Sequence, residues 1–188
     1  MKRSLLIAGI ISIAAAVFLL GASIYATHTS EKLSVSYVQT IRTLIPEPEG
    51  AVLKEKYDNT MPSLSVDGID FVGILEMPDY SSALPVCAQW NRPSKYPCRL
   101  SGSIYDGSMQ IGGTTQNGQY DFYRDISVGD QVYFTDMQGA RYGYTVKDIR
   151  YEKHADQSAL TSEDAPLTLF IKNVYGFDYI LIFCDILN

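Results

Sequence analysis

The chain has 188 residues, of which 46% are hydrophobic and 12% aromatic. A chain of this size can bury one good core and little more. Its formal net charge of −6 excludes nucleic acid as an expected partner, and its 14 tyrosines suit an exported surface protein.

The first predicted element is a transmembrane helix over residues 5–26, a run without a charged residue. At 1.5 Å per residue it would extend roughly 33 Å, enough to cross a hydrocarbon core of about 30 Å. Lys2 and Arg3 precede the run, and Glu31 is the first acid after it. By the positive-inside rule we expect residues 1–4 in the cytoplasm and the remainder outside the cell.

A cleaved signal peptide is the alternative interpretation of the same run. Gly21, Ala22 and Ser23 supply the small residues that a cleavage site needs. The length of the apolar run favours a retained, single-pass anchor in the cell membrane.

A second, amphipathic helix is predicted over residues 31–45. Apolar side chains recur there at intervals of three and four residues, at Leu33, Tyr37, Val38, Ile41 and Leu44. Pro46 stops the helix because proline cannot continue its hydrogen-bond ladder. Residues 51–66 are polar without a clear period, so residues 27–66 are predicted to form a helical stalk and linker.

From Gly68 onward the pattern changes to short β-rich runs separated by turn residues. The expected strands are 69–76, 84–88, 108–112, 131–135, 142–151, 167–172 and 179–186. So many short strands must close into a barrel or pair as two sheets to hide their edges. Periodicity alone does not choose between the two.

Five segments of the chain carry motifs in a fixed order. Ile74–Pro78 with Leu84–Val86 is similar to IxIPxIxxxLPV, and Tyr96–Ser103 to PCRYSGS. The remaining three are Gln110–Thr115 (QIGGTT, similar to VIAGHN), Val128–Asp136 (similar to xxGDxVxFTD) and Leu167–Lys172 (similar to TLxTC). Together they resemble the motifs of the sortase family, in particular a clostridial-type branch. The resemblance implies a mainly β fold, a closed eight-stranded barrel with short helices over residues 67–188, preceded by one N-terminal transmembrane helix.

The resemblance also locates the family's three reactive residues, and none of them is present. The position of the catalytic histidine holds Thr114, that of the nucleophilic cysteine holds Lys172, and that of the arginine holds Tyr179. Threonine cannot act as a base near neutral pH, and a protonated amine is no nucleophile. Tyrosine can donate one hydrogen bond but lacks the charge and fork of a guanidinium. We therefore expect no catalytic residue at this site.

The other reactive side chains are few. Cys184 is expected to be an apolar core residue, with a displaced nucleophile as the alternative, and whether Cys87 and Cys98 form a disulfide stays open. His28 and His154 are expected to be solvated polar residues. No cluster has the spacing of metal ligands, and the acids Asp156, Glu163 and Asp164 are expected to form a solvated loop rather than a calcium site.

The sequence thus predicts a catalytically degenerate, membrane-anchored extracellular protein of a Gram-positive cell wall. The expected partners are the membrane, through the N-terminal helix, and a sorting-signal-like peptide, a pilin or a partner sortase; no cofactor is expected. The candidate ligand-binding residues are Thr114, Lys172, Tyr179, Trp90 and Tyr96, although Trp90 and Tyr96 also suit packing against the barrel. The alternatives are an active cysteine transpeptidase with a displaced nucleophile and a structural envelope protein.

Overall fold

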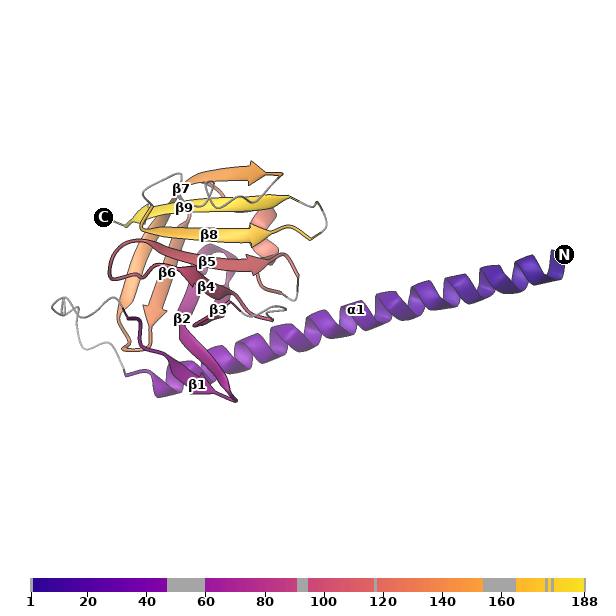
Figure 1. Cartoon of the computed structure of the whole chain (residues 1–188), viewed down its shortest axis with the longest axis horizontal. Coiled ribbons are helices and arrows are strands. Elements are labelled where there is room, and N and C mark those ends of the chain that lie inside the picture. The colour runs from indigo at the N-terminus through magenta and orange to yellow at the C-terminus, as the bar shows by residue number, and fades with distance from the viewer. Residues whose placement is uncertain are drawn as a thin grey trace.

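One long helix and a β-barrel make up the molecule (Figure 1). The computed structural model describes residues 2–46, 60–90, 95–116, 118–153, 165–174, 176 and 178–187. The helix α1 (Lys2–Leu44) lies along one side of the barrel with its C-terminal part, and its N-terminal part projects away from the barrel (Figure 1). Two short 3₁₀ helices, η1 (Pro78–Tyr80) and η2 (Asp121–Arg124), lie between strands.

Eight strands close into a barrel, as the family resemblance implied. They pair in the order β2-β3-β4-β5-β8-β9-β7-β6, and β6 pairs again with β2 to close the ring. The neighbours β3–β4 and β5–β8 are parallel, and the other pairs are antiparallel. The bounds are β1 (Leu64–Val66), β2 (Ile69–Met77), β3 (Ser82–Cys87), β4 (Cys98–Ser101), β5 (Met109–Thr114), β6 (Gln131–Asp136), β7 (Arg141–Glu152), β8 (Leu167–Lys172) and β9 (Tyr179–Ile186).

Each of the seven strands expected from the sequence overlaps an observed strand, but β1 and β4 were missed. β1 falls in the stretch predicted to be a linker, and it adds to the edge of β2 beside the closed ring. β4 is only four residues long and carries Arg99 in its middle. Strands this short show no alternation that a periodicity argument could detect.

Alternating side chains fill the barrel, as the pleat of a β-strand requires. Along β8, Leu167, Leu169 and Ile171 are fully buried inside, while Phe170 and Lys172 point to the outer face. These inward side chains fill the interior of the barrel, so any binding site on these strands must lie on the outer face.

The helix α1 docks on the outside of the barrel through its last third. Ser34, Val38 and Ile41 are buried there, and Ile41 is completely inaccessible. Leu33 and Leu44, which were expected on the apolar face of the helix, are 38% and 57% exposed. They lie roughly 60–80° around the helix from Ile41, at the margins of the buried stripe.

The N-terminal part of α1 fits a single-pass membrane anchor. It is long and apolar enough to cross a bilayer, and the described side chains of residues 9–25 are exposed. A run of exposed Ile, Val, Leu and Phe is costly in water and favourable in lipid.

Candidate functional site

The three substituted positions lie side by side at the ends of three neighbouring strands. Thr114 of β5 is the direct partner of Lys172 in the parallel pair with β8. Lys172 is in turn the direct partner of Tyr179 in the antiparallel pair with β9. Partners on neighbouring strands lie about 5 Å apart and point to the same face. Thr114, Lys172 and Tyr179 therefore form one row, called here the strand-end row.

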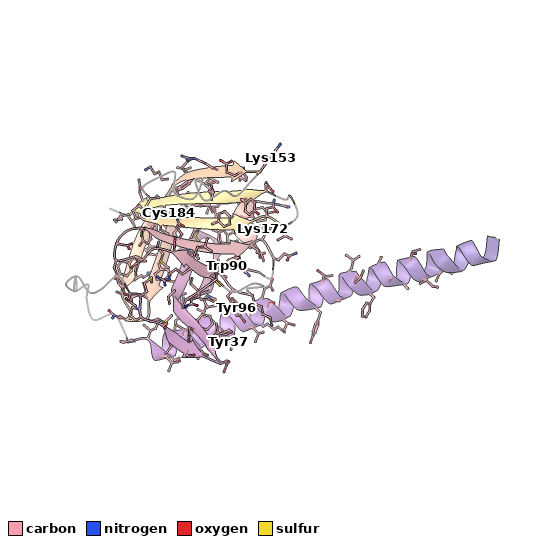
Figure 2. All side chains as sticks on the ribbon, viewed as in Figure 1. Tyr37, Trp90, Tyr96, Lys153, Lys172 and Cys184 are labelled. Atoms are coloured by element: carbon pink, nitrogen blue, oxygen red, sulfur yellow. The ribbon has the colours of Figure 1, made fainter. Side chains whose placement is uncertain are left out.

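The strand-end row faces outward and borders an aromatic surface. Lys172 is exposed, and Thr114 and Tyr179 are partly buried. The ring of Phe170 stacks on Tyr179 with 5.1 Å between centroids and 25° between planes. Phe170 also packs against Leu181 and Phe183, which are buried, so Phe170 is the partly accessible member of this cluster beside the row. The row thus presents one ammonium group beside a partly apolar wall (Figure 2 shows Lys172 at the end of β8).

The loop after β5 is tied to the strand-end row by backbone hydrogen bonds. The amide of Thr115 donates to the carbonyl of Lys172 at 3.1 Å. The amide of Thr114 donates to Gln119 Oε1 at 3.0 Å, and the amide of Gln116 donates to Thr114 Oγ1 at 3.2 Å. The Thr114 hydroxyl therefore helps to form the turn.

Gly113 allows this loop to fold back onto β5. A Cβ atom there would lie 2.3 Å from the ring of Tyr120 and 2.9 Å from Gln119 Oε1. The side chain of Tyr120 enters the barrel core and is fully buried. Its hydroxyl is the single buried side-chain polar atom without a hydrogen-bond partner among the described residues.

All three cysteines are buried. Cys184 points into the barrel core, where burial, with a smaller contribution from Asp185, raises the pKa of its thiol to about 12. Cys87 and Cys98 are direct partners on β3 and β4, in the cluster between the barrel and α1. Thiolates are the reactive form, so Cys184 does not suit a displaced nucleophile.

Trp90 and Tyr96 lie with the helix interface rather than with the strand-end row (Figure 2). Tyr96 is only 4% exposed and meets the rings of Tyr37 and Phe71 edge-on, with centroids 5.5 and 6.1 Å away. Trp90 is half-buried against the same cluster. Tyr96 therefore has no surface to offer a ligand, because Tyr37 of α1 covers its ring.

Several other candidates cannot be placed. His154, Asp156, Glu163 and Asp164 lie outside the described residues, as does the side chain of His28. Within the described part of the chain, no group of three His, Cys, Asp or Glu residues could hold a metal ion.

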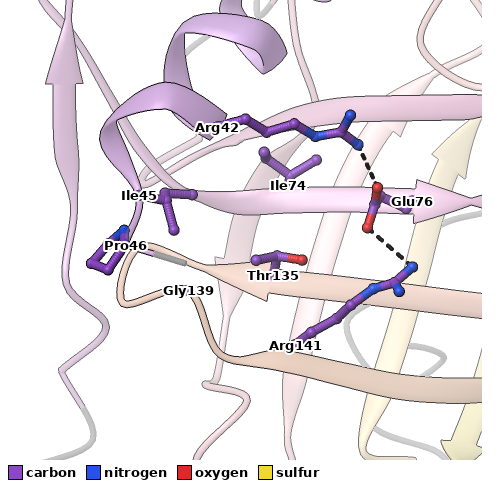
Figure 3. Close-up of a pocket in the computed structure, with 8 residues that line it drawn as sticks. All are labelled: Arg42, Ile45, Pro46, Ile74, Glu76, Thr135, Gly139 and Arg141. Carbon is purple, nitrogen blue, oxygen red and sulfur yellow. Dashed lines mark hydrogen bonds and ion pairs between the residues drawn. The ribbon is translucent and has the colours of Figure 1, made fainter. Parts of the chain in front are cut away.

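A separate cleft of about 410 Å³ opens where the end of α1 meets the barrel (Figure 3). At its centre, Glu76 of β2 pairs with Arg42 of α1 and, at 3.3 Å, with Arg141 of β7. The guanidinium of Arg141 also lies 3.9 Å from the centroid of the Tyr133 ring. The other lining residues are Ile45, Pro46, Ile74, Thr135 and Gly139. Sequence reasoning missed this cluster because its three charges come from elements far apart in the chain.

No protein-family model matches the chain, and no curated protein matches it either. Solved structures do match. Sortase C from Clostridium perfringens with the C-terminal cell wall sorting motif aligns with a TM-score of 0.57 and 16% identity, covering 84% of this chain and 98% of that one. Sortase A from Corynebacterium diphtheriae gives 0.55 and 14%, covering 93% and 96%. The Clostridium perfringens sortase D5 transpeptidase gives 0.54 and 13%, covering 63% and 80%. The barrel is therefore a sortase-like fold.

Proposed function

We propose that this protein is a membrane-anchored, extracellular sortase-like barrel of a cell wall that binds an extended peptide at the strand-end row and does not catalyse transpeptidation. The observation that carries the proposal is the register of β5, β8 and β9. It supports the residue correspondence, because the three substituted positions converge as a reactive triad must.

The side chains in the row support the absence of chemistry. Acyl transfer needs a nucleophile, a base that shuttles its proton and a donor for the oxyanion. The row supplies an exposed ammonium, a hydroxyl that accepts a turn hydrogen bond and a phenol stacked on Phe170. None of these is a competent nucleophile or base near neutral pH.

The same side chains support binding. An exposed cation beside an apolar wall fits an extended segment that carries a carboxylate next to apolar side chains. Holding a carboxylate at Lys172 is the role that we assign to that residue. The Clostridium perfringens sortase C was solved with a C-terminal cell wall sorting motif, and by analogy we propose a sorting-signal-like peptide here, carried by a pilin or by a partner sortase.

Peptide binding to the full-length protein in detergent tests the proposal. We expect a fluorescent sorting-signal-like peptide with an acidic residue to bind, and Lys172→Gln to weaken binding several-fold. Lys147→Gln is the matched control, since Lys147 is exposed in the middle of β7, away from the row. Equal affinity for the wild type and Lys172→Gln would remove the role of Lys172.

The two alternatives have their own readouts. A peptide with a thiol-reactive warhead should leave no covalent adduct, and an adduct on Cys87, Cys98 or Cys184 would favour the active transpeptidase. Failure of every peptide to bind, without any adduct, would favour a structural envelope protein that reuses the barrel.

A further inference from the structure

The apolar segment that can span a membrane and the segment that docks on the barrel belong to one continuous helix. α1 runs without interruption from Lys2 to Leu44. Between Ala22 and Ile45 the sequence contains no glycine and no proline, the usual causes of a sharp kink. The direction of the barrel relative to the span is therefore set by the docking of α1.

The docking holds α1 at two separated points. Near its outer end, Arg42 pairs with Glu76 on β2 (Figure 3). Nearer the span, Glu31 packs against Gly118 in the loop after β5, and its charge adds to burial in raising the pKa of Asp121. The two points lie about 16 Å apart along the helix axis, with Val38 and Ile41 buried between them. The Arg42–Glu76 pair and the buried Val38 and Ile41 fix the helix on the barrel, and the contact of Glu31 with Gly118 shows that the docked part extends toward the span.

The barrel begins where the span ends. The apolar run ends at Ala26, so Glu31 is about 7.5 Å further along the axis. The headgroup region on each side of a bilayer is roughly 5–8 Å thick. Tyr25, which is 76% exposed, occupies the interfacial position that aromatic residues favour. The loop that touches Glu31 therefore stands at the outer boundary of the headgroup region.

The end of the barrel that faces this boundary carries the strand-end row. β5 and β8 both point toward the projecting part of α1 (Figure 1), and Lys172 and Lys153 lie at that end (Figure 2). Gly118, which contacts α1, comes shortly after Thr114. The C-terminus lies at the opposite end (Figure 1), where Ile186 is 62% exposed.

We propose that this end of the barrel rests on the lipid headgroups of the membrane that α1 spans, so that the strand-end row opens at the bilayer surface. The contact is imposed by the helix rather than by charge. Lys153 and Lys172 at this end are accompanied by acids such as Glu152, Asp121 and Asp178. A ligand of the row must therefore approach along the membrane plane. The inference needs α1 to span a membrane but does not depend on peptide binding.

Depth-dependent quenching on the full-length protein tests this surface. Single variants Lys153→Cys, Lys172→Cys and Ile186→Cys would be labelled with one fluorophore and reconstituted into phosphatidylcholine vesicles with nitroxide headgroups. Ile186 is the matched control, because it lies roughly 23 Å along β9 from Tyr179, the partner of Lys172. The native cysteines are buried, which keeps labelling at the introduced thiol.

We expect quenching at positions 153 and 172 to be several-fold stronger than at position 186. A flexible Gly-Ser insert between residues 27 and 28 should abolish the difference, because it uncouples the barrel from the span. Equal quenching at the three positions would overturn the proposal, and so would a difference that survives the insert. Since no peptide is present, this result is separate from the failure or success of peptide binding.

Discussion

Lys172 and Tyr179 are direct partners in the antiparallel pair β8–β9, and Thr114 lies on the other side of Lys172. Thr114 and Tyr179 are 65 residues apart in the sequence, yet only two strand spacings of roughly 5 Å separate them in the barrel. A cysteine at position 172 would therefore lie between a histidine at position 114 and an arginine at position 179, one strand spacing of about 5 Å from each.

The first prediction restores that trio. In the variant Thr114→His, Lys172→Cys and Tyr179→Arg, a neighbouring imidazolium and guanidinium should favour the thiolate and lower the thiol pKa below its free value of about 8.5. The single variant Lys172→Cys lacks these charges and should titrate near that free value. The measurement is the rate of alkylation against pH. A triple variant that folds yet titrates like the single variant would contradict the residue correspondence.

The second prediction concerns the docking of α1. Ile41→Ala removes a completely buried side chain and should lower the free energy of unfolding by about 2–5 kcal/mol. Leu44→Ala, on the same helix but 57% exposed, should change it by less than about 0.5 kcal/mol. Urea unfolding in detergent can be followed by Trp90, the single tryptophan, which packs at this interface. Similar effects of the two variants would mean that Ile41 does not anchor the helix.

The closed barrel was predictable from the sequence, but only by resemblance. Alternating runs located most strands, whereas the choice of a barrel over two sheets came from the five ordered motifs. Closure depends on β6 pairing with β2, a contact between segments about 60 residues apart that no local pattern records.

The strand-end row was predictable, and so was the apolar face of the helix that carries Val38 and Ile41, but the surface on which this helix docks was not. Thr114, Lys172 and Tyr179 were located by motif, and the register brings them together. For Tyr96 the sequence left ligand binding and packing open, because a loop aromatic gives no sign of what covers it. Here the cover is Tyr37 on α1, a residue far away in the sequence.

The third prediction is a loss of stability in alkali. Burial raises the pKa of the Cys184 thiol from 9.0 to about 12. Burial is also the largest cause that raises the pKa of the Tyr96 hydroxyl from 10.0 to about 12. The native state thus favours their protonated forms. The contribution of these protonated groups to the free energy of unfolding is complete below their pKa values in the unfolded chain. It is lost as the pH rises from about 9 to about 12.

Urea unfolding at a series of alkaline pH values measures this loss. Cys184→Ala should be less stable at neutral pH yet show a shallower decline, because one of the titrating groups is gone. An unfolding free energy that stays constant up to about pH 11 would contradict the third prediction.

The last prediction uses the buried hydroxyl of Tyr120. This oxygen has no hydrogen-bond partner in the described part of the chain, although Tyr120 is fully buried beside Gly113. An unsatisfied buried polar group costs about 1–3 kcal/mol, so Tyr120→Phe should raise the free energy of unfolding by about that amount. Tyr105→Phe is the matched control, since the Tyr105 hydroxyl donates to Asp136 Oδ2 at 3.0 Å and its loss should destabilise the barrel. Destabilisation by Tyr120→Phe would show instead that an internal water satisfies the hydroxyl, because removing a satisfied hydrogen bond has the opposite sign.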